Sequence, residues 1–203
     1  MRIGILGGTF DPPHNGHLRL AAAARDQLQL GRVLFAPAGL QPLKRDQHVS
    51  PPEPRAAMVG LAIAGTAGFE LSRIDLDRPG PQHTVDLLRI ASGIYPDAPL
   101  WFIMGGDLIA DLPRWRAPDR LTKFARLAVL RRPGFAPDWA ALEAALPDLR
   151  SRVDWIDGPP IDVSARDIRR RVRDGESIAG LVPPAVAQYI VEKQLYKSEE
   201  RRL

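Results

Sequence analysis

The stretch RIGILGGTFDPPHNGHLRLAAAARDQLQLGRVLFAP, residues 2–37, decides the fold of this chain. It opens with the apolar run 2–6, which meets two glycines and therefore predicts a buried strand that ends there. Asn15 is a favourable helix cap, and the apolar spacing after it predicts a helix to about residue 30. A second apolar run at 33–37 predicts another strand. A strand–helix–strand unit of this length implies parallel pairing through a right-handed crossover.

The rest of the sequence continues this alternation. We expect helices at about 54–64, 84–94, 137–149, 165–174 and 184–194, and strands at about 69–74, 100–104, 127–130 and 153–156. The pattern predicts an α/β fold with a Rossmann-like open, mainly parallel sheet and helices on both faces. No repeat or linker divides the sequence, so we predict a single domain over 1–203. Its C-terminal helical portion, about 164–196, should pack on the rest, and the tail 197–203 should be frayed.

Composition and length limit the class of protein. The chain has 203 residues, which suits one domain. It contains no apolar run of about 18 residues and no signal-peptide pattern, so we expect no membrane partner. Cysteine is absent. This absence excludes disulfides, cysteine nucleophiles and thiolate zinc sites, and it agrees with a cytoplasmic location.

The net charge of +4 is concentrated in one segment. Residues 166–173 hold five arginines and one aspartate, so this segment alone carries +4. A diffuse excess would indicate general affinity for nucleic acid or membranes. A concentrated excess at a helix start favours one local polyanion site instead, with a solvated basic helix as the alternative. We therefore expect no nucleic-acid partner.

Two glycines and two histidines lie between the first strand and the first helix. Gly7 and Gly8 let backbone N–H groups approach an anion, and the helix start adds a positive dipole end. His14 and His17 are three residues apart, so both side chains can point into the same space, and Gly16 leaves room for a ligand. The alternatives are a tight turn at the glycines and core or surface histidines. A metal site would lack further ligands at a recognisable spacing.

A second group of polar residues begins the helix expected at 165–174. Ser164 followed by Asp167 resembles a capping box, with aspartate in place of the usual glutamate or glutamine. A hydroxyl at a helix N-terminus beside arginines such as Arg169 suits a polyphosphate, because dipole and charge act together.

Further candidates follow other strands. Asp107 could accept hydrogen bonds from ribose hydroxyls or could cap a helix. Trp115 could stack on a flat ring or pack in the core, and Arg132 could bind phosphate or face solvent. Because the carboxyl ends of parallel strands meet at one edge of a sheet, the loops at 7–8, 105–107 and 131–132 should face one crevice.

Together these motifs resemble a known family. Residues 14–17, HNGH, are similar to the [His or Thr]-x-Gly-His signature of the nucleotidyltransferase α/β phosphodiesterase superfamily, and residues 164–169 to its second motif, Ser-x-Thr-x-Ile-Arg. More narrowly, the chain resembles the bacterial nicotinate-nucleotide adenylyltransferases over nearly its whole length. The matching pieces are GGTFDPPHNGH (7–17), FAPAG (35–39), Lys44, DRPGPQHTVDLL (77–88), FIMGGD (102–107), DLPRW (111–115), RRPG (131–134), VSARDIR (163–169) and VPPAVAQYI (182–190).

The resemblance implies an enzyme that transfers AMP from ATP to nicotinate mononucleotide, giving deamido-NAD and pyrophosphate. It implies that His14 and His17 are catalytic, contacting the ATP phosphates and stabilising the transition state. The implied ATP site also contains Gly7, Gly8, Phe10, Gly16, Asp107, Ser164 and Arg169, and the implied mononucleotide site contains Thr9, Lys44, Thr84, Trp115 and Arg132. Mg²⁺ is expected with the ATP phosphates, without metal ligands from the chain. The oligomeric state is left open.

Four positions depart from the pattern of the resembled family. Arg166 stands where threonine is usual, and Leu43 where histidine is often found; both bear on the phosphate contacts. His83 replaces a usual tyrosine near the nicotinate side, and Gly106 replaces a usual alanine. The alternatives are a sister enzyme that prefers nicotinamide mononucleotide, a pantetheine-phosphate adenylyltransferase and, from another class, a non-catalytic nucleotide-binding module. Pantetheine enzymes lack a segment like DLPRW.

Overall fold

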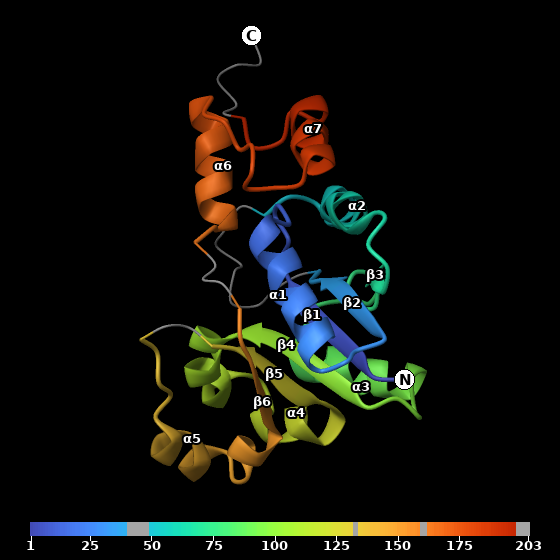
Figure 1. The fold of residues 1–203 in the computed structure, drawn as a ribbon. Helices are drawn as coiled ribbons and strands as arrows, with labels where there is room; N and C mark the ends of the chain where they lie inside the picture. The colour runs from blue at the N-terminus through green and yellow to red at the C-terminus, as the bar shows by residue number, and fades with distance from the viewer. Residues whose placement is uncertain (40–48, 132–133, 159–161, 198–203) are drawn as a thin grey trace.

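The computed structural model describes residues 1–39, 49–131, 134–158 and 162–197 (Figure 1). None of the helices within these ranges is both long and apolar enough to cross a bilayer. Strands and helices alternate as the sequence predicts. In chain order the elements are β1 (Ile3–Gly8), α1 (Asn15–Gln27), β2 (Arg32–Pro37), α2 (Pro52–Ile63), β3 (Phe69–Leu71), α3 (Thr84–Ile94), β4 (Leu100–Gly105), the 3-10 helix η2 (Gly106–Arg114), α4 (Pro118–Phe124), β5 (Arg126–Leu130), α5 (Trp139–Ala145), the 3-10 helix η3 (Leu149–Arg152), β6 (Val153–Ile156), α6 (Ala165–Asp174) and α7 (Pro184–Glu192).

The six strands form a parallel sheet in the order β3-β2-β1-β4-β5-β6. The chain winds outward from β1 to β3, returns to the other side of β1, and winds outward again to β6. β1 and β4 are neighbours, with Ile3 opposite Leu100 and Leu6 opposite Ile103. Where the strand order reverses in this way, a doubly wound sheet leaves a ligand crevice beyond the carboxyl ends of its strands. The predicted Rossmann-like open parallel sheet is confirmed.

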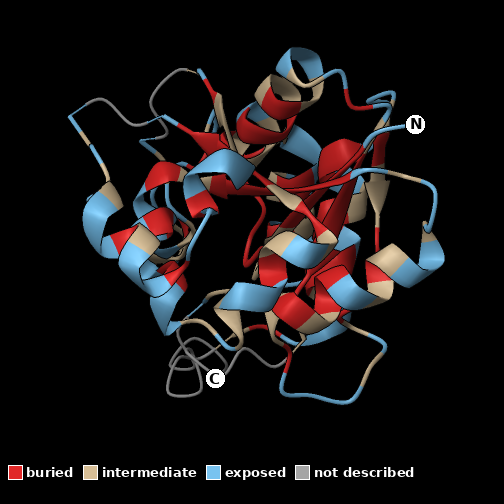
Figure 2. Cartoon of the chain, turned by 90° about the horizontal axis from the view of Figure 1, so that it is seen from below, coloured by how far each residue is buried: buried red, intermediate tan, exposed pale blue. Residues whose placement is uncertain are grey.

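Two hydrophobic layers cover the two faces of the sheet, and Figure 2 shows buried residues gathered in the sheet and on the helix sides that face it. Successive residues of β1 point to opposite faces, so Ile5 packs in one layer and Leu6 in the other. α1, α2, α6 and α7 cover the face of Leu6, while α3, η2, α4 and α5 cover the other. α6 and α7 lie together beside α2 at one end of the molecule (Figure 1). Through Ile168 and Ile190 they share the layer of Leu6.

The structure departs from the predicted elements in several places. The strand expected at 69–74 is β3, which ends at Leu71, and the helix expected at 137–149 is the shorter α5, followed by η3. η2 and α4 form where no element was predicted; η2 is stable because Ile109 and Leu112, three residues apart, are both buried. The cap of α1 is His14, and the prediction of Asn15 was wrong by one residue. The Asn15 side chain instead donates to the carbonyl of Gly180 at 2.8 Å, so it joins α1 to the segment before α7.

Candidate functional site

β1 ends in the loop that carries the predicted nucleotide-binding residues. Gly7 and Gly8 are its last residues, and packing leaves little room for a side chain at either. A Cβ at Gly7 would lie 3.2 Å from the Phe102 ring, and one at Gly8 would lie 3.2 Å from the Phe10 ring. Phe10 is buried and has a φ of 51°, in the left-handed region that costs a non-glycine residue roughly 1–2 kcal/mol. A strained turn therefore follows the glycines directly.

His14 and His17 form a stacked pair at the start of α1. Their ring centroids are 3.6 Å apart with 23° between the ring planes, and Phe10 meets His17 edge-on at 4.9 Å. The backbone N–H of His14 donates to Nδ1 of His17 at 3.1 Å, so the His17 side chain accepts from the cap residue as the N3 side chain does in a capping box. Since Nδ1 accepts this hydrogen bond, the neutral His17 ring carries its proton on Nε2. The structure brings both rings into one space, as their spacing predicts.

Burial changes the chemistry of His14. The residue is 6% exposed, and desolvation by burial lowers its pKa to about 4, so the ring is neutral near pH 7. Its Nδ1 is buried and has no hydrogen-bond partner among the described residues. A buried polar atom without a partner requires an explanation, and a ligand that supplies the partner is one.

We expect the free protein to lose stability between about pH 6.5 and pH 4 because of His14. The unfolded chain binds this proton near pH 6.5 and the folded protein only near pH 4, so stability falls as the pH falls through this window. The lost stability should approach about 3 kcal/mol at the acid end. Urea unfolding at a series of pH values measures the effect. A His14→Gln variant should lack this part of the pH dependence, and equal curves for the two proteins would contradict the burial account.

α6 begins with the predicted serine cap and is joined to the histidine loop. The Oγ of Ser164 accepts the backbone N–H of Asp167 at 3.1 Å. Arg169, in the next turn, donates from Nη1 to the carbonyl oxygen of Asp11 at 2.7 Å. This contact brings the start of α6 against the loop that leads into His14. The helix that Ser164 caps is therefore in contact, through Arg169, with the loop after β1.

Arg55, on α2, is a residue of this site that the sequence reasoning missed. It is 1% exposed, and its guanidinium donates to the backbone carbonyls of Thr9 at 2.8 Å, Ala38 at 2.6 Å and Ser50 at 2.9 Å. Burial lowers the pKa of this guanidinium, and the Asp11 carboxylate partly offsets the effect. Arg55 thereby fixes the loop after β1, which carries the histidines, against the loop after β2.

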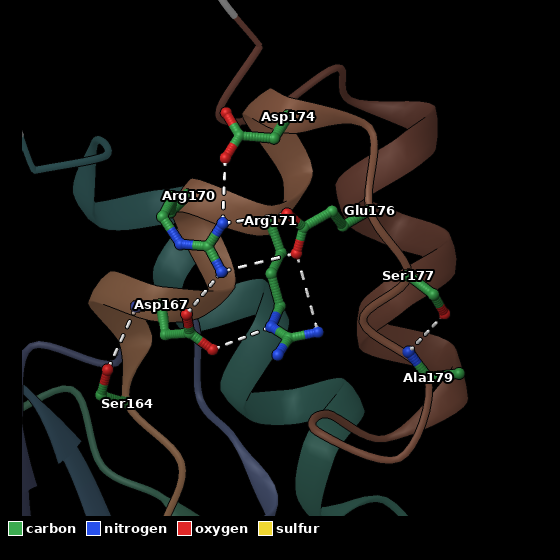
Figure 3. Close-up of polar contacts among 8 residues, drawn as sticks. All are labelled: Ser164, Asp167, Arg170, Arg171, Asp174, Glu176, Ser177 and Ala179. Atoms are coloured by element: carbon green, nitrogen blue, oxygen red, sulfur yellow. Dashed lines mark hydrogen bonds and ion pairs between the residues drawn. The ribbon is translucent and has the colours of Figure 1, made fainter.

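The net charge on and just after α6 is lower than residues 166–173 alone predict. Arg170 donates to Asp174 and Glu176 at 3.0 Å each, and Arg171 donates to Asp167 at 2.9 Å; Figure 3 draws these contacts. Counted to residue 176, five arginines face three carboxylates, so the segment carries +2 and the predicted concentration of +4 is an overestimate. A groove of about 270 Å³ remains there, lined by Ser164, Arg166, Asp167, Arg170 and Arg173.

The predicted residues near the end of β4 lie in or beside η2. Asp107 is in the first turn of η2, but Gly105 is the cap, so the alternative of Asp107 as a helix cap is wrong. Trp115 follows η2, is half-buried, and meets Phe102 at 6.1 Å with the rings nearly perpendicular. Because Phe102 also faces Gly7, one ring separates Trp115 from the glycine loop.

The other predicted residues are described in part. Thr84 is the first residue of α3 and follows its cap, His83. Gly16 is buried in the first turn of α1. Lys44 and Arg132, together with the departure at Leu43, lie outside the described residues.

The chain is similar over nearly its whole length to known nucleotidyltransferases. The sequence model of the cytidylyltransferase-like family matches residues 5–171. A probable nicotinate-nucleotide adenylyltransferase of Roseiflexus sp. is 47% identical over 96% of this chain and 98% of its own length. Its counterpart in Thermomicrobium roseum is 45% identical over 98% of this chain and 93% of its own length.

A solved structure shares the fold. The nicotinic acid mononucleotide adenylyltransferase of Plasmodium falciparum complexed with NaAD matches with a TM-score of 0.79, over 96% of this chain and 97% of that one. Its identity is 19%, so this likeness supports the fold alone. The relatives of higher identity show the family. The chain belongs to the nicotinate-nucleotide adenylyltransferases, a family of nucleotidyltransferases within the cytidylyltransferase-like group.

Proposed function

We propose that this chain transfers AMP from ATP to nicotinate mononucleotide, with deamido-NAD and pyrophosphate as products. An oxygen of the mononucleotide phosphate attacks the α-phosphorus of ATP. The bond from that phosphorus to the oxygen bridging to the β-phosphate breaks, and its electron pair leaves with pyrophosphate. The observation that carries the proposal is the stacked pair His14–His17 at the start of α1, at the end of the loop that follows Gly8 and that Arg169 of α6 contacts at Asp11.

This reaction needs positioning and charge stabilisation more than it needs an activated side chain. The attacking phosphate is already an anion, so neither a nucleophilic residue nor a general base is required. His14, neutral near pH 7, would donate a hydrogen bond to a phosphate oxygen without adding a fixed charge. The Nε2–H of His17 would act in the same way, and the N-terminal dipole of α1 favours the same anion.

We assign ATP to the space between the glycine loop and the start of α6. There Gly7, Gly8 and Phe10 shape the loop, while Gly16 lets the ligand approach α1. Ser164 and Arg169 would hold the β- and γ-phosphates, and Asp107 would accept hydrogen bonds from the ribose hydroxyls. The described residues contain no group of three or more histidines or carboxylates that could hold a metal ion. We propose that Mg²⁺ enters on the ATP phosphates, where it would neutralise part of their charge.

We assign the mononucleotide to the side of the crevice near Trp115. Its half-buried indole offers a face on which the pyridine ring can stack. Phe102 packs against the same indole with its ring nearly perpendicular and so supports it. Thr9, Thr84, Lys44 and Arg132 complete the proposed mononucleotide site. Of these, Thr9 has its carbonyl oxygen held by Arg55, so the two substrates share one anchored loop.

Pyrophosphate release from ATP and Mg²⁺, measured in parallel with the acid and the amide mononucleotide, tests the proposal. We expect release with nicotinate mononucleotide and much slower release with the amide. A preference for the amide would overturn only the substrate assignment, because the two rings differ only in that group. Silence with both, together with tight ATP binding, would instead support a non-catalytic nucleotide-binding module.

Replacing Trp115 with alanine should raise KM for the mononucleotide by about tenfold while changing KM for ATP by less than about twofold, since loss of stacking costs about 1–2 kcal/mol. Steady-state kinetics with each substrate varied in turn measures the two constants. Trp139→Ala is the matched control, because Trp139 is a half-buried tryptophan of α5 that packs against Trp155. An equal rise in both KM values for Trp115→Ala would contradict the stacking role.

A further inference from the structure

Tyr196, shortly after α7, reaches the loop that leads into the histidine pair. Its hydroxyl donates to Oδ1 of Asp11 at 2.6 Å, across 185 residues of sequence, and lies 3.9 Å from the sulfur of Met58. Burial, with the neighbouring Asp11 carboxylate, raises the pKa of Tyr196. The hydroxyl therefore stays protonated and remains the donor.

Asp11 is 2% exposed and is held from three sides. Besides the Tyr196 hydroxyl on Oδ1, its Oδ2 accepts the backbone N–H of Ser50 at 2.9 Å and its carbonyl oxygen accepts Nη1 of Arg169 at 2.7 Å. The donors come from the segment before α2, from α6 and from the segment after α7. A buried carboxylate needs such donors, because losing one leaves an uncompensated acceptor.

The backbone is strained on both sides of this contact. Gln194 and Tyr196 have φ values of 51° and 64°, and Phe10, next to Asp11, has a φ of 51°. None of these residues is glycine, so each conformation costs free energy that the surrounding contacts must offset. Residues held in such conformations cluster at functional sites. Here they turn Tyr196 back toward the loop after β1.

We propose that Tyr196 is a positioning residue of the adenylyl transfer, whose hydroxyl fixes Asp11 and thereby the histidine pair. The inference rests on the proposed function. Only Pro12 and Pro13 separate Asp11 from His14, and proline rings lock φ, so a shift of Asp11 moves the start of α1 with it. Because the His14 ring is stacked on the His17 ring, a shift of His14 changes the position of both rings.

The test is Tyr196→Phe, which keeps the ring and removes only the hydroxyl. We expect kcat to fall about tenfold, with both KM values changed by less than about twofold, because misplacement by a fraction of an ångström affects the transition state more than binding. Tyr189→Phe is the matched control: Tyr189 lies on α7, and its hydroxyl makes no hydrogen bond among the described residues. Each kcat is divided by the fraction of folded protein at the assay temperature, which thermal melting measures.

Two further measurements separate positioning from simple anchoring of the chain end. In the free protein, hydrogen exchange of the amides at 9–17 should be at least about tenfold faster in Tyr196→Phe than in Tyr189→Phe. In a double-mutant cycle with Asp11→Asn, the fold-loss in kcat of the double variant should be much smaller than the product of the two single fold-losses. A kcat per folded molecule equal to that of Tyr189→Phe, or unchanged exchange at 9–17, overturns the inference. If the wild-type protein transfers no AMP, the proposed function fails, and the exchange comparison still decides the role of Tyr196 in fixing the loop.

Discussion

Replacing His17 with alanine is expected to lower kcat by about 100-fold or more, with much smaller changes in both KM values. The ring stacks on His14 and carries its proton on Nε2, because Nδ1 already accepts the backbone N–H of His14. The Nε2–H group is therefore the donor that would meet charge developing on the phosphates. An interaction made mainly in the transition state appears in kcat when it is removed. Pyrophosphate release under saturating substrates measures it.

His17 also has a structural role, and the experiment must separate the two. Alanine at this position removes the acceptor for the His14 N–H, which should cost about 1 kcal/mol and lower the melting temperature by a few degrees. His17→Gln is the matched control, since glutamine at the third position of a helix can reach back to the cap N–H. We expect His17→Gln to melt close to the wild type and still to lose about 100-fold in kcat.

The two variants together distinguish catalysis from packing. Recovery of most of the activity in His17→Gln would show that the ring serves only the helix cap. A large loss of stability in both variants, with a normal kcat per folded molecule, would identify His17 as a core residue. Either result would contradict its proposed place at the ATP phosphates.

The parts of the site that are local in sequence could be predicted. The glycines after β1, the histidines three residues apart and the serine that caps α6 each follow from short-range rules, because a strand end, a helix start and a cap are set by neighbouring residues. The parallel pairing of the sheet also followed from the alternation of strands and helices. The cap of α1 was missed by one residue, because the preference for asparagine as a cap was overridden by its long-range contact with Gly180.

The contacts that join distant segments could not be predicted in this way. Nothing near Asp11 in the sequence indicates that Tyr196 will meet it, since 185 residues separate them. The charge of the basic segment differs from its prediction for a related reason: residues 166–173 carry +4, but Asp174 and Glu176, just beyond them, neutralise Arg170. One feature of the sequence does indicate the role of Arg55. It shares the buried stripe of α2 with Met58 and Val59, where a charged side chain must find buried partners.

Replacing Arg55 with methionine is expected to lower the free energy of unfolding by about 3–5 kcal/mol. Methionine fills much of the space of the arginine stem but cannot donate a hydrogen bond. The carbonyls of Thr9, Ala38 and Ser50 would then be buried without this donor, at roughly 1–3 kcal/mol for each that finds no other. Removing the buried charge relieves part of this cost, which is why the expected loss is below the sum. Urea unfolding at pH 7.5 measures the difference.

Arg73→Met is the matched control, and it decides whether burial or the number of contacts matters. The Arg73 side chain donates to Glu53 and Asp77 through well-formed ion pairs at 2.7 and 2.8 Å, but it is 40% exposed. Water can replace such partners, so this variant should be far less destabilised than Arg55→Met. Similar losses in the free energy of unfolding of the two variants would mean that the burial of Arg55 does not make its contacts more stabilising than those of Arg73. A large loss in Arg55→Met alone would establish that one buried guanidinium holds the loops after β1 and β2 together, and hence the two sides of the proposed site.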